Sequence, residues 1–252
     1  MELLRSAAFF LCCFSVTFLL AQKPKLVLPV GHTSIVGSVV YSPDGKYILT
    51  ASWDNTAKVW QAGDGKLLYE IKGHTGSVTS ATFSPDGRYI LTSSKDNSAK
   101  IWDARNGQLL HDLPGHSDWV NSASFSCDGK YIVTSSWDST AKIWNASDGN
   151  VLVVLKGHRA KINTALFSRD GNYIVTGSSD STAKIWKVAD GKMLVDLKGH
   201  AGGVNSAIFS NDEKYVLTGS SDNTARVWRV SDGKLFVDLK GHAAGINTAI
   251  FS

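Results

Sequence analysis

GHRAKINTALFSRDGNYIVTGSSDSTAKIWKVADGKMLVDLK, residues 157–198, is the stretch that decides the fold of this 252-residue chain. The next 42 residues, 199–240, match it at 24 of 42 positions without a gap. A Gly-His pair opens each copy and recurs every 42 residues, at Gly31-His32, Gly73-His74, Gly115-His116, Gly157-His158, Gly199-His200 and Gly241-His242. A tryptophan keeps the same spacing near the end of each complete copy, at Trp60, Trp102, Trp144, Trp186 and Trp228. The chain is therefore an array of one repeated unit.

Short apolar segments alternate with turn residues within each unit, and no stretch has a helical period. In the second unit we predict strands at 78–84, 89–94, 99–103 and 108–113. The first two are joined by Ser84-Pro85-Asp86-Gly87, which has proline at the second position of a β-turn. Glu213 replaces the glycine of this turn in the fifth unit, so we expect a different turn type there. Four short strands in a period of this length are typical of a propeller blade.

The opening Gly-His, the aspartate of the tight turn and the closing tryptophan resemble those of the WD-repeat (Trp-Asp repeat) β-propeller family, over residues 26–252. The resemblance implies an all-β propeller with five complete four-stranded blades and an incomplete sixth, in one domain at 22–252. The repeats are 31–72, 73–114, 115–156, 157–198 and 199–240, followed by a partial repeat at 241–252 that stops after its first strand. Two explanations stay open, a fragment of a larger ring or an unusual closure in which open blade edges pair with a second copy. We favour the fragment because the break falls in mid-repeat.

The N-terminal segment differs in kind from the repeats. Arg5 precedes the apolar residues 7–20, and Ala21 follows them, so we predict a signal peptide at 1–21. The apolar run is shorter than the roughly 20 residues of a membrane span, and a signal anchor is the alternative. Cleavage would remove two of the three cysteines and leave Cys127, so the mature chain would form no internal disulfide. We therefore expect an exported protein (periplasmic, cell-surface or secreted) with no stable membrane span after cleavage.

The charge pattern and the motifs exclude several classes of function. The formal net charge is +4, but the basic residues recur singly at repeat positions and form no stripe, so we expect no nucleic-acid partner. The repeated histidines occur one per unit, each with an aspartate of its own unit, so they should not converge on a metal ion. The sequence contains no phosphate-binding loop. We expect neither a metal nor a cofactor.

Each complete unit also carries a histidine, a threonine, an aspartate and a tryptophan at fixed offsets. Such a set invites a catalytic interpretation, but an enzyme needs one set and this chain has five equal ones. The resemblance implies instead a structural relay in which the aspartate binds the histidine and backbone amides, the histidine binds the threonine hydroxyl, and the threonine meets the indole N–H. We therefore predict a non-catalytic protein. The relay sets are His32, Thr50, Asp54 and Trp60; His74, Thr92, Asp96 and Trp102; His116, Thr134, Asp138 and Trp144; His158, Thr176, Asp180 and Trp186; and His200, Thr218, Asp222 and Trp228.

Residues that vary between the units are better candidates for function. Three tryptophans fall outside the repeated position, and the resemblance implies that they look out from the top face around the central channel. Large aromatic side chains beside cations suit a protein-binding hot spot. The alternative is that these rings pack on neighbouring turns and only cover hydrophobic surface. We predict that a protein or peptide partner contacts Trp53, Lys95, Asp118, Trp119, Trp137, Arg159 and Lys161.

The preferred hypothesis is thus a non-catalytic interaction scaffold that presents its top face to a protein or peptide. Two other functions stay open. In the first, the chain is a segment of a larger multidomain exported protein whose activity lies outside this chain. The propeller would bind a small ligand if its central channel held a unique polar cluster, and the sequence shows none.

Overall fold

The computed structural model describes residues 31–252, and every regular element in that range is a β-strand. Twenty strands form five antiparallel sheets of four, each built from four consecutive strands. This confirms the predicted all-β fold with five complete four-stranded blades. The predicted signal peptide at 1–21 lies outside the described residues.

Each blade takes its four strands from one 42-residue unit, and we number the blades in chain order. Blade 1 contains β1 Val36–Tyr41, β2 Tyr47–Ser52, β3 Ala57–Gln61 and β4 Leu67–Ile71. Blade 2 contains β5 Val78–Phe83, β6 Tyr89–Ser94, β7 Ala99–Asp103 and β8 Leu109–Leu113. Blade 3 contains β9 Val120–Phe125, β10 Tyr131–Ser136, β11 Thr140–Asn145 and β12 Val151–Lys156. Blade 4 contains β13 Ile162–Phe167, β14 Tyr173–Ser178, β15 Thr182–Lys187 and β16 Met193–Lys198. Blade 5 contains β17 Val204–Phe209, β18 Tyr215–Ser220, β19 Ala225–Arg229 and β20 Leu235–Leu239.

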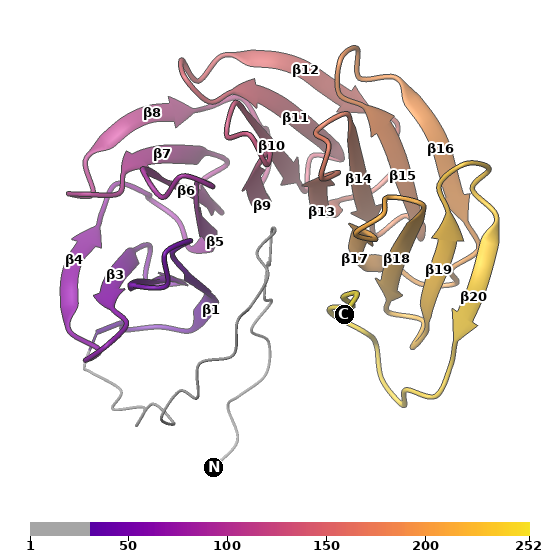
Figure 1. The fold of residues 1–252 in the computed structure, drawn as a ribbon, viewed down its shortest axis with the longest axis horizontal. Coiled ribbons are helices and arrows are strands. Elements are labelled where there is room, and N and C mark those ends of the chain that lie inside the picture. Colours follow the sequence, from indigo (N-terminus) through magenta and orange to yellow (C-terminus); the bar gives the residue numbers. More distant parts are fainter. Residues whose placement is uncertain (1–30) are drawn as a thin grey trace.

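The blades fan around a common centre and form an arc that is open between blade 5 and blade 1 (Figure 1). The first strand of each blade lies nearest the centre, and the fourth lies at the rim. We call the end that carries the loops between second and third strands, and between consecutive blades, the top face. The remaining loops form the bottom face. Because strands alternate in direction, every unit sends equivalent loops to the same face.

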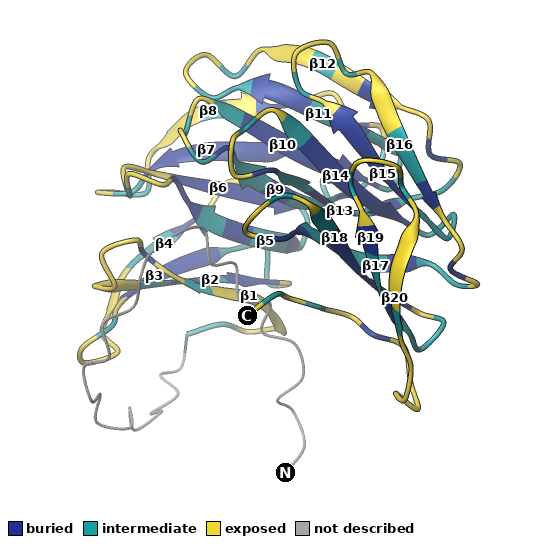
Figure 2. Ribbon diagram, turned by 45° about the vertical axis from the view of Figure 1, so that its right-hand side comes forward, coloured by how far each residue is buried: buried dark blue, intermediate teal, exposed yellow. Residues whose placement is uncertain are grey.

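The hydrophobic core lies between the blades. Leu49, Val59 and Ile71 of blade 1 pack against Val78 and Trp102 of blade 2, and each is at most 2% exposed. The same positions pack between the later blades, so the 42-residue period builds one interface several times. Buried residues concentrate on the inner strands, whereas rim strands such as β12 and β20 are largely exposed (Figure 2).

The two ends of the arc expose positions that the other blades bury. Val36 of blade 1 is 40% exposed, whereas its equivalent Val78 is 1% exposed. Leu239 of blade 5 is 46% exposed, whereas its equivalent Leu155 is 0% exposed. Burial at these positions therefore depends on a neighbouring blade and not on the strand itself.

The partial sixth unit does not form the first strand that the sequence predicts, and residues 241–252 contain no regular strand. They still lie where the next inner strand belongs. The backbone oxygen of Ile246 accepts a hydrogen bond from Asn205 Nδ2 at 3.0 Å, just as that of Val204 accepts one from Asn163 at 2.9 Å. The physical reason is that a strand needs a ladder partner, and within residues 31–252 no second strand of this unit pairs with the segment.

The turn at Glu213 corrects a second expectation. The Glu213 amide donates to Ser210 O at 2.9 Å, as the Gly129 amide donates to Ser126 O in blade 3. Glu213 has a φ of 58°, so it occupies the left-handed region that glycine occupies elsewhere (72° at Gly129). The turn type is therefore the same in both blades, and the glutamate accepts the strain of a positive φ. Its Oε1 accepts the Asp170 amide at 2.8 Å, which helps to hold this conformation.

Candidate functional site

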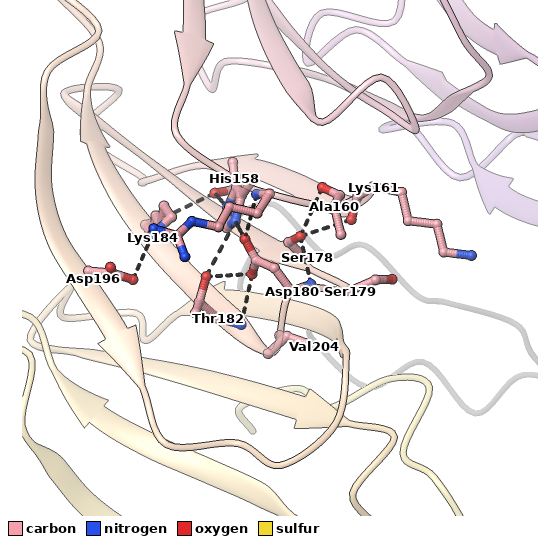
Figure 3. A network of polar contacts seen from close by, with 12 residues as sticks. His158, Ala160, Lys161, Ser178, Ser179, Asp180, Thr182, Lys184, Asp196 and Val204 are labelled. Atoms are coloured by element: carbon pink, nitrogen blue, oxygen red, sulfur yellow. Dashed lines mark hydrogen bonds and ion pairs between the residues drawn. The ribbon is translucent and has the colours of Figure 1, made fainter.

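The relay residues of each blade form one chain of hydrogen bonds. In blade 4, His158 Nδ1 lies 2.8 Å from Asp180 Oδ2, and His158 Nε2 lies 2.8 Å from Thr176 Oγ1 (Figure 3). Trp186 Nε1 donates to the same Thr176 oxygen at 2.8 Å. The indole can only donate, so the proton order that satisfies every group has the threonine O–H donating to Nε2 and Nδ1–H donating to the aspartate.

The same contacts recur with little variation in every complete blade. The distance from the histidine to the aspartate is 2.7–2.8 Å in the five sets, and the distance to the threonine is also 2.7–2.8 Å. Each indole nitrogen lies 2.8–2.9 Å from its threonine. The structure therefore brings together all twenty residues that the sequence assigns to the relay, four in each blade.

Burial and hydrogen bonding set the charge of the relay. Burial acts to raise the pKa of Asp180, but hydrogen bonds from the Thr182 hydroxyl, the Arg159 amide and His158 outweigh it and lower that pKa to about 2. Burial lowers the pKa of His158, although Asp180 acts in the opposite direction. The pKa of His200 in blade 5 is lowered for the same reason. The aspartate is thus ionised and the histidine neutral near pH 7.

This arrangement is unsuited to nucleophilic catalysis. In blades 2 to 5 the relay threonine is 0% exposed, so a substrate has no access to its hydroxyl. That oxygen already accepts the indole N–H while its proton bonds the histidine, which leaves no reactive lone pair directed at solvent. Five equivalent copies also give no unique reaction centre.

Each relay has a fifth member, a serine or threonine hydroxyl, that the sequence did not lead us to predict. Thr182 Oγ1 donates to Asp180 Oδ1 at 2.6 Å, and it lies 3.3 Å from His158 Nδ1. A serine or threonine stands two residues after the turn aspartate in every complete unit, and this periodicity was the signal that could have found it. The residues are Thr56, Ser98, Thr140, Thr182 and Thr224.

Five of the seven predicted partner-binding residues meet in a single stack on the top face. Lys95 Nζ lies 4.2 Å from the ring centroid of Trp53 and 4.3 Å from that of Trp119. The Trp119 and Trp137 centroids are 4.2 Å apart, with the rings tilted by 35°. Lys161 Nζ lies 4.1 Å from the Trp137 centroid. The stack runs Trp53, Lys95, Trp119, Trp137 and Lys161, and it joins blades 1 to 4.

Backbone hydrogen bonds of the repeat explain why these side chains meet. The residue before the turn aspartate always donates its amide to the residue at the third position after the repeated histidine. In blade 3 this bond joins Trp137 N to Trp119 O at 2.9 Å, so two indoles at these positions are forced together. At the far end of the arc, small residues replace the next pair of the stack. Ser179 of blade 4 stands at the position of Trp137, Gly203 of blade 5 stands at the position of Lys161, and the two face each other. The stack therefore ends at blade 4.

Trp53, at the other end of the stack, is 44% exposed. A β-carbon at Gly37 would lie 3.5 Å from the Trp53 indole nitrogen, so the indole rests directly over this glycine. The later units have threonine or asparagine at the position of Gly37. The absence of a side chain at Gly37 thus makes room for a ring that the other blades do not carry.

The remaining two predicted residues do not join the stack. The Arg159 side chain is exposed, and its backbone amide donates to Asp180 Oδ2 at 3.0 Å. Asp118 is half-buried, and its Oδ1 accepts the Trp119 amide at 2.7 Å. Asp118 thus borders the stack, whereas within residues 31–252 no ring contact involves the Arg159 side chain.

Two other kinds of site receive no support from residues 31–252. No group of three or more His, Cys, Asp or Glu side chains gathers in this range to hold a metal ion. The same residues contain no helix with the length and hydropathy to cross a membrane.

Comparison with known proteins identifies the repeat. The profile of the "WD domain, G-beta repeat" family matches residues 22–61, 65–103, 107–145, 149–187 and 191–229, which together make up more than half of the chain. Ribosome assembly protein 4 of Saccharomyces cerevisiae is 50% identical over 38 residues, which are 15% of this chain and 7% of that protein. Ribosome assembly protein 4 of Chaetomium thermophilum is 47% identical over 47 residues (19% and 9%). A probable cytosolic iron-sulfur protein assembly protein 1 of Mycosarcoma maydis is 49% identical over 35 residues (14% and 8%). Each match spans less than a tenth of the relative, about the length of one repeat.

Proposed function

The chain belongs to the WD-repeat family, and on that premise we propose that it is a non-catalytic interaction scaffold whose top face binds a protein or peptide. WD repeats are typical of proteins that hold other proteins. The observation that carries the proposal is the stack of Trp53, Lys95, Trp119, Trp137 and Lys161. Its residues occupy positions that vary between the units, on a scaffold built largely from repeated contacts.

The stack has the composition of a binding hot spot. Tryptophans carry large apolar area with few rotamers to freeze, and the cations over their faces add charged groups to the surface. Each ring here is also held in place by its neighbour, so little side-chain entropy remains to be lost on binding. Covering hydrophobic surface and binding a partner are therefore compatible roles for the same residues.

Polar side chains of the inner strands favour the top face over a small ligand in the channel. Asn163 Nδ2 donates to Val204 O at 2.9 Å, and Asn205 Nδ2 donates to Ile246 O at 3.0 Å. Asn121 bonds the backbone of Asn163 in the same way. These amides tie consecutive blades together, and their donors are not directed at a ligand.

We also propose that residues 1–21 are a signal peptide and that the domain at 22–252 is exported. The printed name of the Mycosarcoma maydis relative includes the word cytosolic, but that match covers 35 residues of a repeat and carries no location signal. N-terminal sequencing of the protein from its native cell tests the proposal. A mature chain that begins at Gln22 supports it, and a chain that keeps Met1 or starts at Glu2 contradicts it.

The test of the scaffold is a quantitative pull-down from the native cell with three forms of the protein. Trp119→Ala combined with Trp137→Ala removes the centre of the stack. The matched control combines Leu152→Ala with Leu194→Ala, which removes apolar side chains 49% and 45% exposed on β12 and β16. We expect partners of the wild type to be lost from the tryptophan variant and kept by the control. Retention of the same partners by a folded tryptophan variant would refute the proposal.

A further inference from the structure

Both faces of Trp119 and Trp137, and one face of Trp53, are already occupied within the chain. Lys95 lies between Trp53 and Trp119, and Trp137 lies between Trp119 and Lys161. A nucleobase needs a free ring face on which to stack, and a partner cation needs a free face to lie over. At Trp119 and Trp137 the surface therefore offers ring edges, flanked by two ammonium groups, in place of open ring faces.

Within residues 31–252, both ammonium groups lie over aromatic rings and neither has a carboxylate partner. Lys58 pairs with Glu70 at 2.8 Å and Lys100 with Asp112 at 2.9 Å, so these third-strand cations are neutralised within their blade. Lys142 of blade 3 donates instead to the Gly115 backbone oxygen. Among residues 31–252, neither Lys95 nor Lys161 forms an ion pair, and Figure 3 shows the Lys161 side chain extending away from the neighbouring relay. A half-buried cation held by aromatic rings and lacking a counter-charge is prepared to receive an anion.

Arg159 and Asp118 are the other charged residues that the sequence predicted for this face. Arg159 is an exposed cation, and Asp118 is the half-buried carboxylate beside the stack. The turn aspartates of this face are ionised, but their oxygens are already hydrogen-bonded within the relay, as those of Asp138 are to His116 and the Ser117 amide, and they form no ion pair with either ammonium group. An anionic ligand is therefore indicated by the two ammonium groups that lack a carboxylate partner, and not by the net charge of the face.

We propose that the top face recognises an acidic, extended peptide whose carboxylates pair with Lys95 and Lys161 while an apolar side chain covers the edges of Trp119 and Trp137. This deepens the proposed function and rests on it. Spacings of 4.3, 4.2 and 4.1 Å separate the two ammonium groups along the stack. An extended chain covers about 3.3 Å per residue, so acidic residues about four positions apart reach both.

The experiment uses the synthetic peptide Gly-Ser-Glu-Ala-Leu-Ala-Glu-Gly-Ser and the same peptide with glutamine at both glutamate positions. Isothermal titration against the full chain measures each affinity. We expect the glutamate peptide to bind at least about tenfold more tightly, with a difference that shrinks as salt rises.

Single substitutions assign the contacts. Lys95→Met and Lys161→Met should each weaken the glutamate peptide about fivefold to tenfold and leave the glutamine peptide unchanged. Asp118→Asn should strengthen the glutamate peptide because it removes a like charge. Lys66→Met, an exposed lysine of the bottom face, is the matched control and should change neither affinity. Circular dichroism verifies that each variant remains folded.

The outcomes separate this inference from the function on which it rests. Equal affinity for the two peptides, or tighter binding of an eight-residue oligothymidylate than of the glutamate peptide, overturns the acidic-peptide assignment. The scaffold still stands in that case if the tryptophan variant loses the native partners. If the glutamate peptide binds and lysine substitution has no effect, the stack only clamps the blades together and the inference is wrong.

Discussion

Replacing Asp138 by alanine tests whether the relay holds blade 3 together. Asp138 accepts four hydrogen bonds, from His116 Nδ1 at 2.7 Å, the Ser117 amide at 3.1 Å, the Thr140 amide at 2.8 Å and the Thr140 hydroxyl at 2.7 Å. The His116 side chain is 0% exposed, so its N–H would lose its partner without gaining water. An unsatisfied buried donor costs about 1–3 kcal/mol, and bonds to a charged group contribute about 1.5–3 kcal/mol each.

The loss is smaller than the sum of four bonds because the exposed Ser117 amide and the Thr140 groups can turn to water. We therefore expect Asp138→Ala to lower the free energy of unfolding by about 3 kcal/mol. For a chain of this size that corresponds to a Tm lower by about 6–12 °C. Repeat arrays open blade by blade, so hydrogen exchange should rise most in β9 to β11.

Two variants provide the controls for thermal unfolding. Asp138→Asn keeps one acceptor oxygen and should fall between wild type and Asp138→Ala. Asp128→Ala, in a bottom-face turn, removes a carboxylate that is 48% exposed and accepts the Ser126 hydroxyl and the Lys130 amide, so it should cost less than about 1 kcal/mol. A Tm for Asp138→Ala that matches wild type or the Asp128→Ala control would refute the structural role of the relay.

Three more predictions concern stability. Leu155→Ala should lower the free energy of unfolding by about 3 kcal/mol in urea, and Leu239→Ala by less than about 1 kcal/mol. The same repeat position is 0% exposed at Leu155 and 46% exposed at Leu239. Equal losses would contradict the interblade core. Trp144→Phe should cost about 1–2 kcal/mol in the same assay by removing the indole N–H from a buried threonine, and no loss would mean that this bond adds nothing. The folded pKa of His158 lies below its ordinary 6.5, so the unfolded chain binds more protons and stability should fall as the pH drops below about 6.5. Asp180 has a folded pKa of about 2, so its protonation should lower the stability further between about pH 4 and pH 2. Urea midpoints that stay constant from pH 7 to pH 3 would contradict the pH dependence.

The blades could be predicted from the sequence because their signals are local and repeated. The predicted strands at 89–94 and 99–103 coincide with β6 and β7, and the flanking predictions differ from β5 and β8 by one residue each. Turn residues and a fixed period specify such elements without knowledge of the tertiary structure. Residues 241–252 show the limit, because a strand also requires a neighbour to pair with.

The stack could be predicted only in part. Its residues were found because they depart from the repeat, and Trp119 and Trp137 share a blade, which made their proximity foreseeable. The contact of Lys95 with Trp53 and Trp119 joins three blades, so it depends on how closely consecutive sheets approach and on which rotamers the ring faces select. Arg159 has the right composition and position but no contact with a ring, and sequence reasoning offers no means to separate it from Lys161.

Hydrogen exchange of the protein with and without its native partner tests the central claim most directly. If the top face is the binding surface, the partner should slow exchange in the loops that carry the stack, at residues 53–55, 95–97, 117–120 and 137–139. The bottom-face turns and the rim strands β12 and β16 should stay unchanged. Protection confined to the rim or the bottom face would contradict the account.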